Sequence, residues 1–134
     1  MEKTKKQMVM DVVESLGYRP QMDDEGDIYL RFEMKNIYIL TGEEDDRYVM
    51  VLLPQFVDVE QGQEGMAFAI CNRITREYKV LKAYVDRSLR SVSACCELFY
   101  TDEESLTQNI AHSFKLIGIA RSTYKSIMRE CTEE

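Results

Sequence analysis

Tryptophan is absent from the sequence, and proline, histidine and cysteine are rare, with two, one and four residues among 134. The cysteines neither form a Cys-x-x-Cys motif nor reach the density of a disulfide-stapled secreted domain. They indicate reduced thiols in a cytoplasmic protein. Cys95 and Cys96 are adjacent in a strand-like run, so their side chains would point to opposite faces and a vicinal disulfide would strain the backbone. We interpret the pair as small buried hydrophobic residues and not as a redox site.

Long apolar runs are also missing. The longest one, Tyr48–Leu53, is far shorter than the roughly 20 residues that cross a bilayer. Near the N-terminus the apolar groups at 8–10 and 12–13 are separated by Asp11, so the core of a signal peptide is not present. We expect a soluble intracellular protein with no membrane partner.

No catalytic constellation is recognisable. The single histidine, His112, falls on the side of a predicted helix opposite Leu106 and Ile110, and no acid or nucleophile accompanies it in the sequence. No glycine-rich segment fits a P-loop or a dinucleotide-binding motif. Runs of acids such as Glu43–Asp46 are typical of solvated turns. We expect a protein that is not an enzyme, with no catalytic residues and no cofactor, and with His112 on the surface.

The sequence has fewer basic than acidic residues, 17 against 24, which gives a formal charge of −7. Residues 21–60 hold 11 acids and three bases, whereas residues 72–100 hold six bases and three acids, spread over strand and helix positions. Neither pattern forms the basic stripe that neutralises phosphates in nucleic-acid complexes. Nucleic acid is therefore not an expected partner.

The acidic segment Asp23–Asp27 surrounds Gly26 with carboxylates and could suggest a metal loop. An EF-hand loop needs its glycine at position six, which would put Gln21 first and Phe32 twelfth, where carboxylate ligands are required. The motif fails at both ends. A turn that enters a strand explains the segment by local hydrogen bonds and permitted backbone angles, so no metal site is expected.

What is present is the pattern of one globular domain over residues 1–134. Its hydrophobic content of 45% and charged content of 31% are ordinary for a chain that folds around a single core. Apolar residues at helical spacing predict helices over residues 3–16, 63–76 and 101–130. At the start of the last helix, Thr101 and Glu104 fit a capping box.

Alternating apolar residues predict the first strands. Residues 27–34 form one of them, and a two-residue turn at Lys35–Asn36 would pair Met34 with Ile37 in a hairpin. Residues 48–54 are apolar at both parities, which indicates a strand covered on both faces.

Residues 78–86 and 91–100 predict a second hairpin. The resulting order is α-β-β-β-α-β-β-α. Because the strands arrive as hairpins and do not alternate singly with helices, this order predicts an α+β domain whose antiparallel sheet packs against helices.

Four segments, in their order, resemble the YbjN-like family, whose members are labelled bacterial sensory transduction regulators. They are the helix ending in SLGYRP, the turn DDEGD, the CNRIT segment followed by YKVLKAYVD, and the long last helix. The resemblance spans nearly the whole chain and implies a fold similar to that of the type III secretion chaperones. It carries over no catalytic residues. Asn72 is closest to a hallmark of the family, and we interpret it as capping or tethering nearby backbone, in preference to ligand contact.

Secretion chaperones of this fold are small acidic homodimers that hold an extended segment of a client. The resemblance therefore implies a homodimer with a protein or peptide client. Fold analogy alone does not assign that activity, so the argument also depends on the residues themselves.

Two hypotheses follow. The first is a non-enzymatic protein-binding module, chaperone-like or regulatory, that acts as a homodimer through an apolar second face of the sheet. The candidate residues of that face are Tyr29, Tyr38, Leu40, Tyr48, Met50 and Leu52. The second is a small-molecule sensor or an enzyme with a pocket between sheet and helices. A flat exposed apolar patch would favour the first hypothesis and a deep polar-lined pocket the second.

Overall fold

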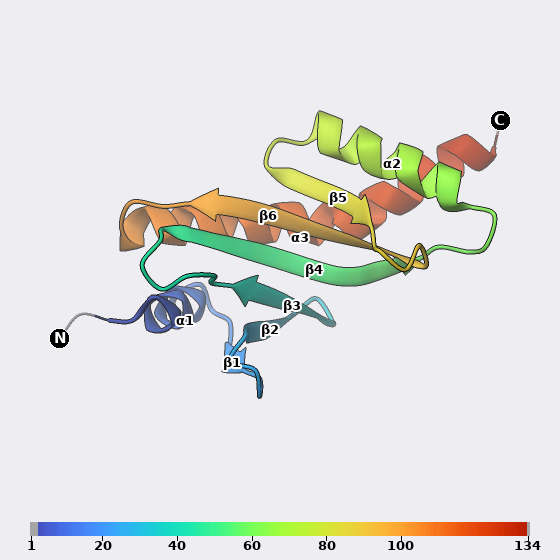
Figure 1. Ribbon diagram of the computed structural model, residues 1–134. Coiled ribbons are helices and arrows are strands. Elements are labelled where there is room, and N and C mark those ends of the chain that lie inside the picture. Colours follow the sequence, from blue (N-terminus) through green and yellow to red (C-terminus); the bar gives the residue numbers. More distant parts are fainter. Residues whose placement is uncertain (1–2, 134) are drawn as a thin grey trace.

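The computed structural model describes residues 3–133, in which three helices accompany one sheet (Figure 1). In chain order the elements are α1 (Lys5–Ser15), β1 (Gln21–Met22), β2 (Ile28–Phe32), β3 (Lys35–Leu40), β4 (Tyr48–Asp58), α2 (Glu64–Glu77), β5 (Leu81–Val85), β6 (Ser91–Phe99) and α3 (Glu103–Thr132).

The six strands lie in the order β1-β2-β3-β4-β6-β5, and every neighbouring pair is antiparallel. The predicted α+β class and the predicted order of elements are confirmed, with one strand added. The added strand, β1, is two residues long and directly follows Pro20. Two residues are too few to show the alternation by which a strand is recognised in a sequence.

The register predicted for the first hairpin is wrong. The turn consists of Glu33 and Met34, which both have positive φ, and Phe32 pairs with Lys35. Two-residue hairpin turns of this kind require left-handed backbone, which costs energy at residues other than glycine. The observed register places Ile37 opposite Leu30 in the fully buried core, and burial of such pairs offsets the cost of the turn.

The third predicted strand was expected to end near Pro54, but β4 continues to Asp58. The pairing of β4 with β6 shifts between Leu53 and Val57, and Gln55 in this bulge has φ 47°. A bulge tolerates proline because the missing N–H falls where the ladder is already interrupted. The Gln55 N–H is satisfied by the Ser93 hydroxyl at 2.9 Å.

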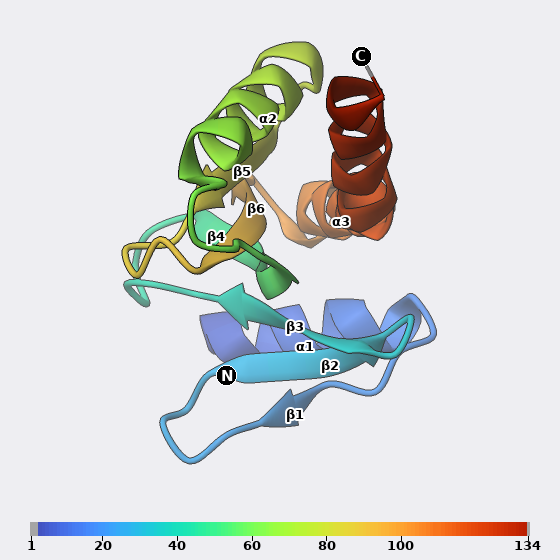
Figure 2. The same cartoon turned by 90° about the vertical axis from the view of Figure 1, so that its right-hand side faces the viewer.

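All three helices pack against the same face of the sheet and share one core. Figure 2 shows α3 to the right of β4 and β6, and α2 above β5 and β6. The cluster of buried apolar residues joins Val9 and Val13 of α1, Ile70 and Ile74 of α2, and Ile110 and Ile117 of α3 to the strands. The inward residues of the central strands are Ile28, Leu30, Ile37, Ile39, Val49, Val51, Ala94 and Cys96. Within residues 3–133 no helix crosses to the second face of β4, so the predicted cover of that face does not come from these helices.

The capping box of α3 is present but one residue later than predicted. Asp102, not Thr101, is the N-cap, and its carboxylate accepts the N–H of Ser105 at 2.8 Å. The Ser105 hydroxyl accepts the N–H of Asp102 in return, so Glu104 is not the reciprocal partner. Ionised Asp at this position is favoured by the positive end of the helix, and the same bonds lower the pKa of Asp102.

The start of α1 is fixed by a buried lysine. The Lys5 ammonium donates to the carbonyl oxygens of Thr41 and Glu43 and to the carboxylate of Asp46, and the Lys5 N–H donates to Glu44 at 2.8 Å. The acidic run 43–46 thus has a structural partner and is more than a solvated turn. Within residues 3–133, no helix has both the length and the apolar character needed to cross a bilayer.

Candidate functional site

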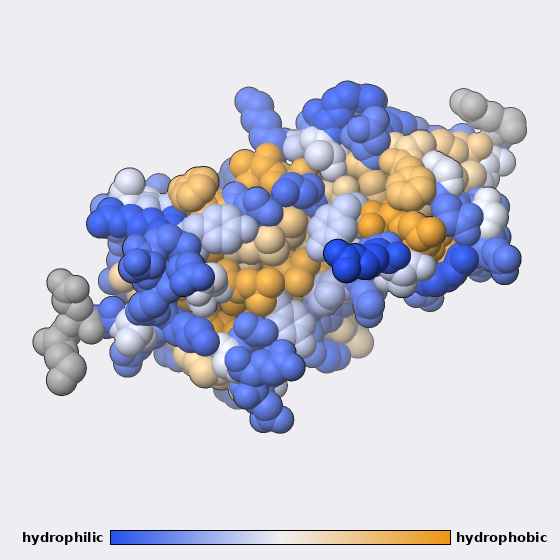
Figure 3. Space-filling view, viewed as in Figure 1, coloured by the Kyte–Doolittle hydropathy of each residue, from blue (hydrophilic) through white to orange (hydrophobic). Residues whose placement is uncertain are grey.

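The face of the sheet opposite the helices is open and apolar. The strand register aligns one row of side chains across it, consisting of Gln21, Tyr29, Tyr38, Leu52, Cys95 and Lys82. A second row consists of Leu40, Met50 and Glu97, and a third of Tyr48 and Phe99. Figure 3 shows the apolar centre of this face and its polar surroundings.

The six predicted face residues all lie on this surface, and each is partly exposed. We call them, together with Phe99 and Tyr84, the open face. Their rings pack in pairs, with centroids 5.8 Å apart for Tyr29 and Tyr38 and 5.7 Å apart for Tyr48 and Phe99. The structure thus assembles the predicted residues into one patch, whereas their binding role stays a prediction.

Two members of the open face were not predicted. The Phe99 side chain is 78% exposed and lies beside Tyr48 at the end of β6. Tyr84 of β5 is 37% exposed and lies opposite Ser93 of β6. Both come from strands whose outward residues are otherwise polar or small, so no apolar alternation singles them out in the sequence.

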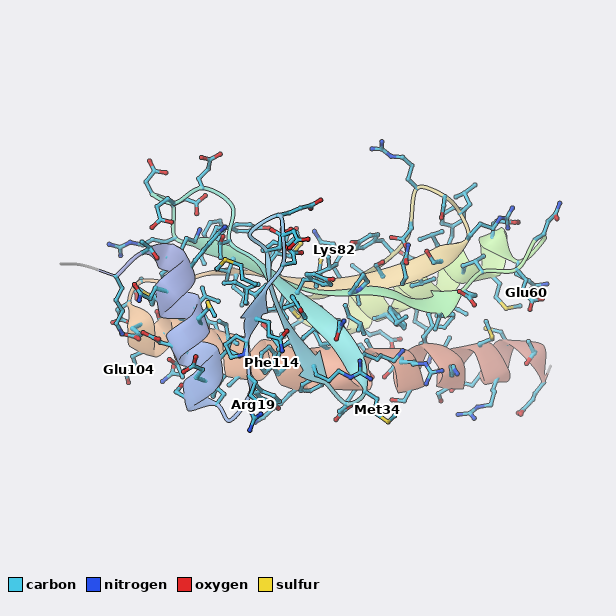
Figure 4. All side chains as sticks on the ribbon, turned by 90° about the horizontal axis from the view of Figure 1, so that it is seen from below. Arg19, Met34, Glu60, Lys82, Glu104 and Phe114 are labelled. Atoms are coloured by element: carbon cyan, nitrogen blue, oxygen red, sulfur yellow. The ribbon has the colours of Figure 1, made fainter. Side chains whose placement is uncertain are left out.

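The rim of the open face is polar. Lys82 and Glu97 form an ion pair at 3.2 Å, and hydrogen bonding to this carboxylate raises the pKa of Lys82. At the other end, the Tyr29 hydroxyl donates to Gln21 at 2.7 Å. Figure 4 shows Lys82 on the side of the sheet away from α3 and Phe114 between the sheet and α3. An apolar centre with a polar rim is the usual anatomy of a protein-binding surface.

The adjacent cysteines lie on opposite sides of the sheet, as predicted, and both are buried free thiols. Cys96 faces the core, and burial raises its pKa to about 11. Cys95 points toward the open face, but the side chains around it there leave it only 1% exposed. Burial raises the pKa of Cys95 too. Thiols held protonated in this way are poor nucleophiles, which supports the interpretation of the pair as packing residues.

The edge strand β5 is closed to further pairing at its centre. The Thr75 hydroxyl of α2 donates to the Ala83 carbonyl at 3.1 Å and accepts the Ala83 N–H at 3.0 Å. These are the backbone groups that an added strand would use. Strand addition at the centre of this edge is therefore blocked.

Hollows also exist on the helix side of the sheet. One of about 580 Å³ lies between the end of β4, α2 and α3, and its lining includes Phe56, Met66, Tyr124 and Met128. A second of about 390 Å³ and a third of about 510 Å³ lie further along α3 beside the β2–β3 hairpin. The pocket that the second hypothesis requires thus has a counterpart in the structure, though His112 is exposed and lines none of these three hollows.

The remaining predicted residues have simple surroundings. The Asp23 carboxylate accepts the N–H groups of Glu25 and Asp27 at 3.0 and 2.8 Å, and Gly26 has φ 84°. The turn interpretation of residues 23–27 is confirmed by these bonds. Asn72 is exposed on α2, and its amide takes part in none of the side-chain hydrogen bonds found within residues 3–133, so its predicted tethering role is wrong.

Comparison with known proteins agrees with this architecture. No curated protein matches the sequence significantly. The crystal structure of YbjN from E. coli superposes with a TM-score of 0.66 at 13% sequence identity, covering 90% of this chain and 89% of the YbjN chain. At that identity the similarity shows the fold alone. Residues 3–114 match the family described as T3SS (YopN, CesT) and YbjN peptide-binding chaperone 1. The chain therefore belongs to this family of type III secretion and YbjN peptide-binding chaperones.

Proposed function

We propose that the protein is a non-enzymatic, chaperone-like or regulatory module that binds a segment of a client protein on its open face. The observation that carries the proposal is the apolar centre of the sheet, which none of the helices in residues 3–133 covers. The family description, which names peptide-binding chaperones, supports the same role. Four free thiols are compatible with a reducing compartment, so we place the protein in the cytoplasm.

Without a client, a second copy covers the open face. Clustered tyrosines, methionine and leucine leave the chain with a surface that is costly to expose to water. A symmetric partner is the commonest way to cover such a surface, and a stable dimer interface would bury about 1,200 to 2,000 Å² in total. Tyr38 lies in the longest row of the face and its ring packs against that of Tyr29, which makes it the expected anchor.

Light scattering after gel filtration tests the dimer. We expect a mass near twice 15.7 kDa for the parent protein and near 15.7 kDa for Tyr38→Glu, because the new carboxylate would be buried without a partner. Phe68→Glu is the matched control, since Phe68 is an exposed aromatic residue on α2, off the open face. A monomeric parent over the micromolar range would contradict the dimer.

Fluorescence anisotropy tests the client site. A labelled peptide that alternates aliphatic and polar residues, VSVTLSVTL, is expected to bind the parent protein and the Phe68→Glu variant, and to lose affinity for Tyr38→Glu. Binding that is equal in all three proteins would place the peptide elsewhere and overturn the role of the open face.

A small-molecule sensor is the second candidate function. The hollow of about 580 Å³ is within the usual size range of ligand pockets and combines apolar walls with Arg121, Lys125, Asp58 and Glu60. Native mass spectrometry of the purified protein discriminates the candidates. A stoichiometric small molecule that stays bound would favour the sensor, whereas the bare dimer mass would favour the protein-binding module.

A further inference from the structure

One hollow on the helix side is strongly basic. The hollow of about 390 Å³ is lined by Lys35 at the start of β3 and by Arg121, Lys125 and Arg129 of α3, with Glu33 as its only acid. Four cations and one carboxylate leave an excess of three positive charges, in a chain whose formal charge is −7. We call these four cationic residues the basic cluster.

The cations of the basic cluster have no anionic partner within the described part of the chain. The ion pairs found in residues 3–133 use Lys3, Lys5, Arg73, Lys82 and Arg90. Burial lowers the pKa of Lys35, and repulsion by Arg121 and Lys125 lowers it further. Cations gathered this closely repel one another, so an anion placed among them would stabilise the arrangement.

The basic cluster has a regular spacing. Arg121, Lys125 and Arg129 recur every four residues on α3, which places successive cations about 6 Å apart along the helix axis. Alternate residues of an extended peptide point to the same side and are also separated by about 6.6 Å. Carboxylates at every second position of an extended segment would therefore meet the three cations in register.

The form of the hollow favours a peptide over a small phosphate compound. Compact phosphate sites use backbone N–H groups at a helix N-terminus, whereas these cations lie in the C-terminal half of α3 (Glu103–Thr132). The three helix cations are exposed and separate, so they suit several carboxylates spread along a chain. Single-stranded nucleic acid offers similar charge spacing, but such complexes also stack successive bases on aromatic side chains, and the lining of this hollow includes one, Phe32.

Hollows with apolar side chains in their walls flank the basic cluster on both sides. Toward the N-terminus of α3, a hollow of about 510 Å³ is lined by Tyr18, Phe32 and Phe114, whose rings contact one another. It shares Phe32, Glu33 and Gly118 with the basic hollow, and Figure 4 shows Phe114 at this position between sheet and helix. Toward the C-terminus, the 580 Å³ hollow shares Arg121 and Lys125 with it.

We propose that the basic cluster binds an acidic stretch of a client in extended form, with Asp or Glu at alternate positions and apolar residues on either side. The proposal rests on the proposed peptide-binding function and adds a second client site on the other side of the sheet from the open face. The family match ends at residue 114, so three of the four cations lie outside the matched part.

The experiment measures fluorescence anisotropy with the labelled peptide LSETETESL at low ionic strength. The double variant Arg121→Gln with Lys125→Gln is expected to bind about tenfold more weakly than the parent, because each exposed ion pair contributes a few-fold in affinity. The matched control is Lys79→Gln with Arg87→Gln, which removes the same charge at two exposed positions outside the hollow and should retain parent affinity. Binding should also weaken with added salt.

Each outcome supports or overturns the site. If both double variants bind LSETETESL equally more weakly than the parent, the effect is one of net charge only and the proposed site is overturned. The site is also overturned if the parent binds LSQTQTQSL as tightly as LSETETESL. Tighter binding of a ten-nucleotide single strand than of LSETETESL would overturn the choice of a peptide ligand. The two proposals can fail separately. If Tyr38→Glu loses VSVTLSVTL binding while the Arg121 and Lys125 changes leave LSETETESL binding unaltered, the open face is supported as a client site and the basic cluster is rejected.

Discussion

The helix-covered face of the sheet is built from aliphatic side chains, whereas the open face is built mainly from tyrosine, methionine and leucine. On adjacent positions of β3, Ile39 is fully buried among the helices and Tyr38 and Leu40 remain partly exposed on the other side. Branched aliphatic side chains pack at high density but form no hydrogen bonds with water. Tyrosine tolerates water at its hydroxyl and buries a large ring when a partner arrives. The same alternation thus serves folding on one face and recognition on the other.

The sharpest test of this comparison is a pair of neighbouring truncations. Ile39→Ala should lower the free energy of unfolding by about 2 to 5 kcal/mol, because it leaves a cavity in the core. Leu40→Ala, one residue along on the open face, should cost less than about 1 kcal/mol in a monomer, since little packing is lost. Urea denaturation followed by circular dichroism measures both. A cost for Leu40→Ala that grows with protein concentration would show that a second copy covers the face.

Much of this contrast could be predicted from the sequence, because alternation fixes which residues share a face. The hairpin error illustrates the limit. Moving the turn from Lys35–Asn36 to Glu33–Met34 shifts the pairing by an even number of positions along the strand, so Tyr29 and Tyr38 keep their face although their partners change. In β4, which is apolar at both parities, the pattern alone does not show which face the helices cover, and only the tyrosines of β2 and β3 mark the other face.

The basic cluster was hidden from the sequence for a different reason. Lys35 is separated from Arg121 by more than 80 residues, and only the packing of the hairpin against α3 brings them to one hollow. Along the chain, the three helix cations look like an ordinary solvated stripe. Similarly, nothing in the sequence marks Lys5 as buried, because its carbonyl partners belong to a loop some 36 to 38 residues away.

The covered face also depends on the anchor of α1. Lys5→Ala should lower the free energy of unfolding by about 1.5 to 3 kcal/mol, because it removes a buried hydrogen-bonded ammonium group and leaves the Thr41 carbonyl without that donor. Chemical denaturation gives the value. The control is Lys6→Ala, whose ammonium makes one bond, to the Gly26 carbonyl at 2.6 Å, at a less buried site. Equal costs at the two lysines would show that burial of Lys5 has no special weight.

The same anchor predicts a dependence on pH. Hydrogen bonding to Lys5 lowers the pKa of Asp46 below its usual value of 3.8. A depressed carboxyl pKa stabilises the folded state above the unfolded pKa, and that contribution is lost as the pH falls through the folded pKa. We therefore expect Asp46→Asn to be less stable than the parent at pH 7 and to approach it below about pH 4. Thermal unfolding at a series of pH values measures the gap, and a constant gap would contradict the linkage.

The thiol reactivities of Cys95 and Cys96 give a direct comparison of the two faces of the sheet. Exposed Cys131 should react first with iodoacetamide at pH 8. Cys95 and Cys96 should react far more slowly, because burial restricts access and raises both pKa values. Between them, Cys95 should react faster, since only partly exposed side chains cover it on the open face. Mass spectrometry of peptides at timed intervals gives the order, and faster labelling of Cys96 would reverse the assignment of the two faces.

The smallest change in stability is expected at the edge of the sheet, in the acidic turn that joins β1 to β2. Added Ca²⁺ or Mg²⁺ at millimolar concentration should leave the melting temperature nearly unchanged, measured by scanning fluorimetry. A bound ligand raises stability only in proportion to its affinity for the folded state. The Asp23 carboxylate already accepts the N–H groups of Glu25 and Asp27, so binding a metal would compete with the bonds that form the turn. A rise of many degrees that saturates at micromolar Ca²⁺ would show that this edge carries a metal site. Asp23→Ala would then have to abolish the rise, whereas in a simple turn it should only lower the starting melting temperature.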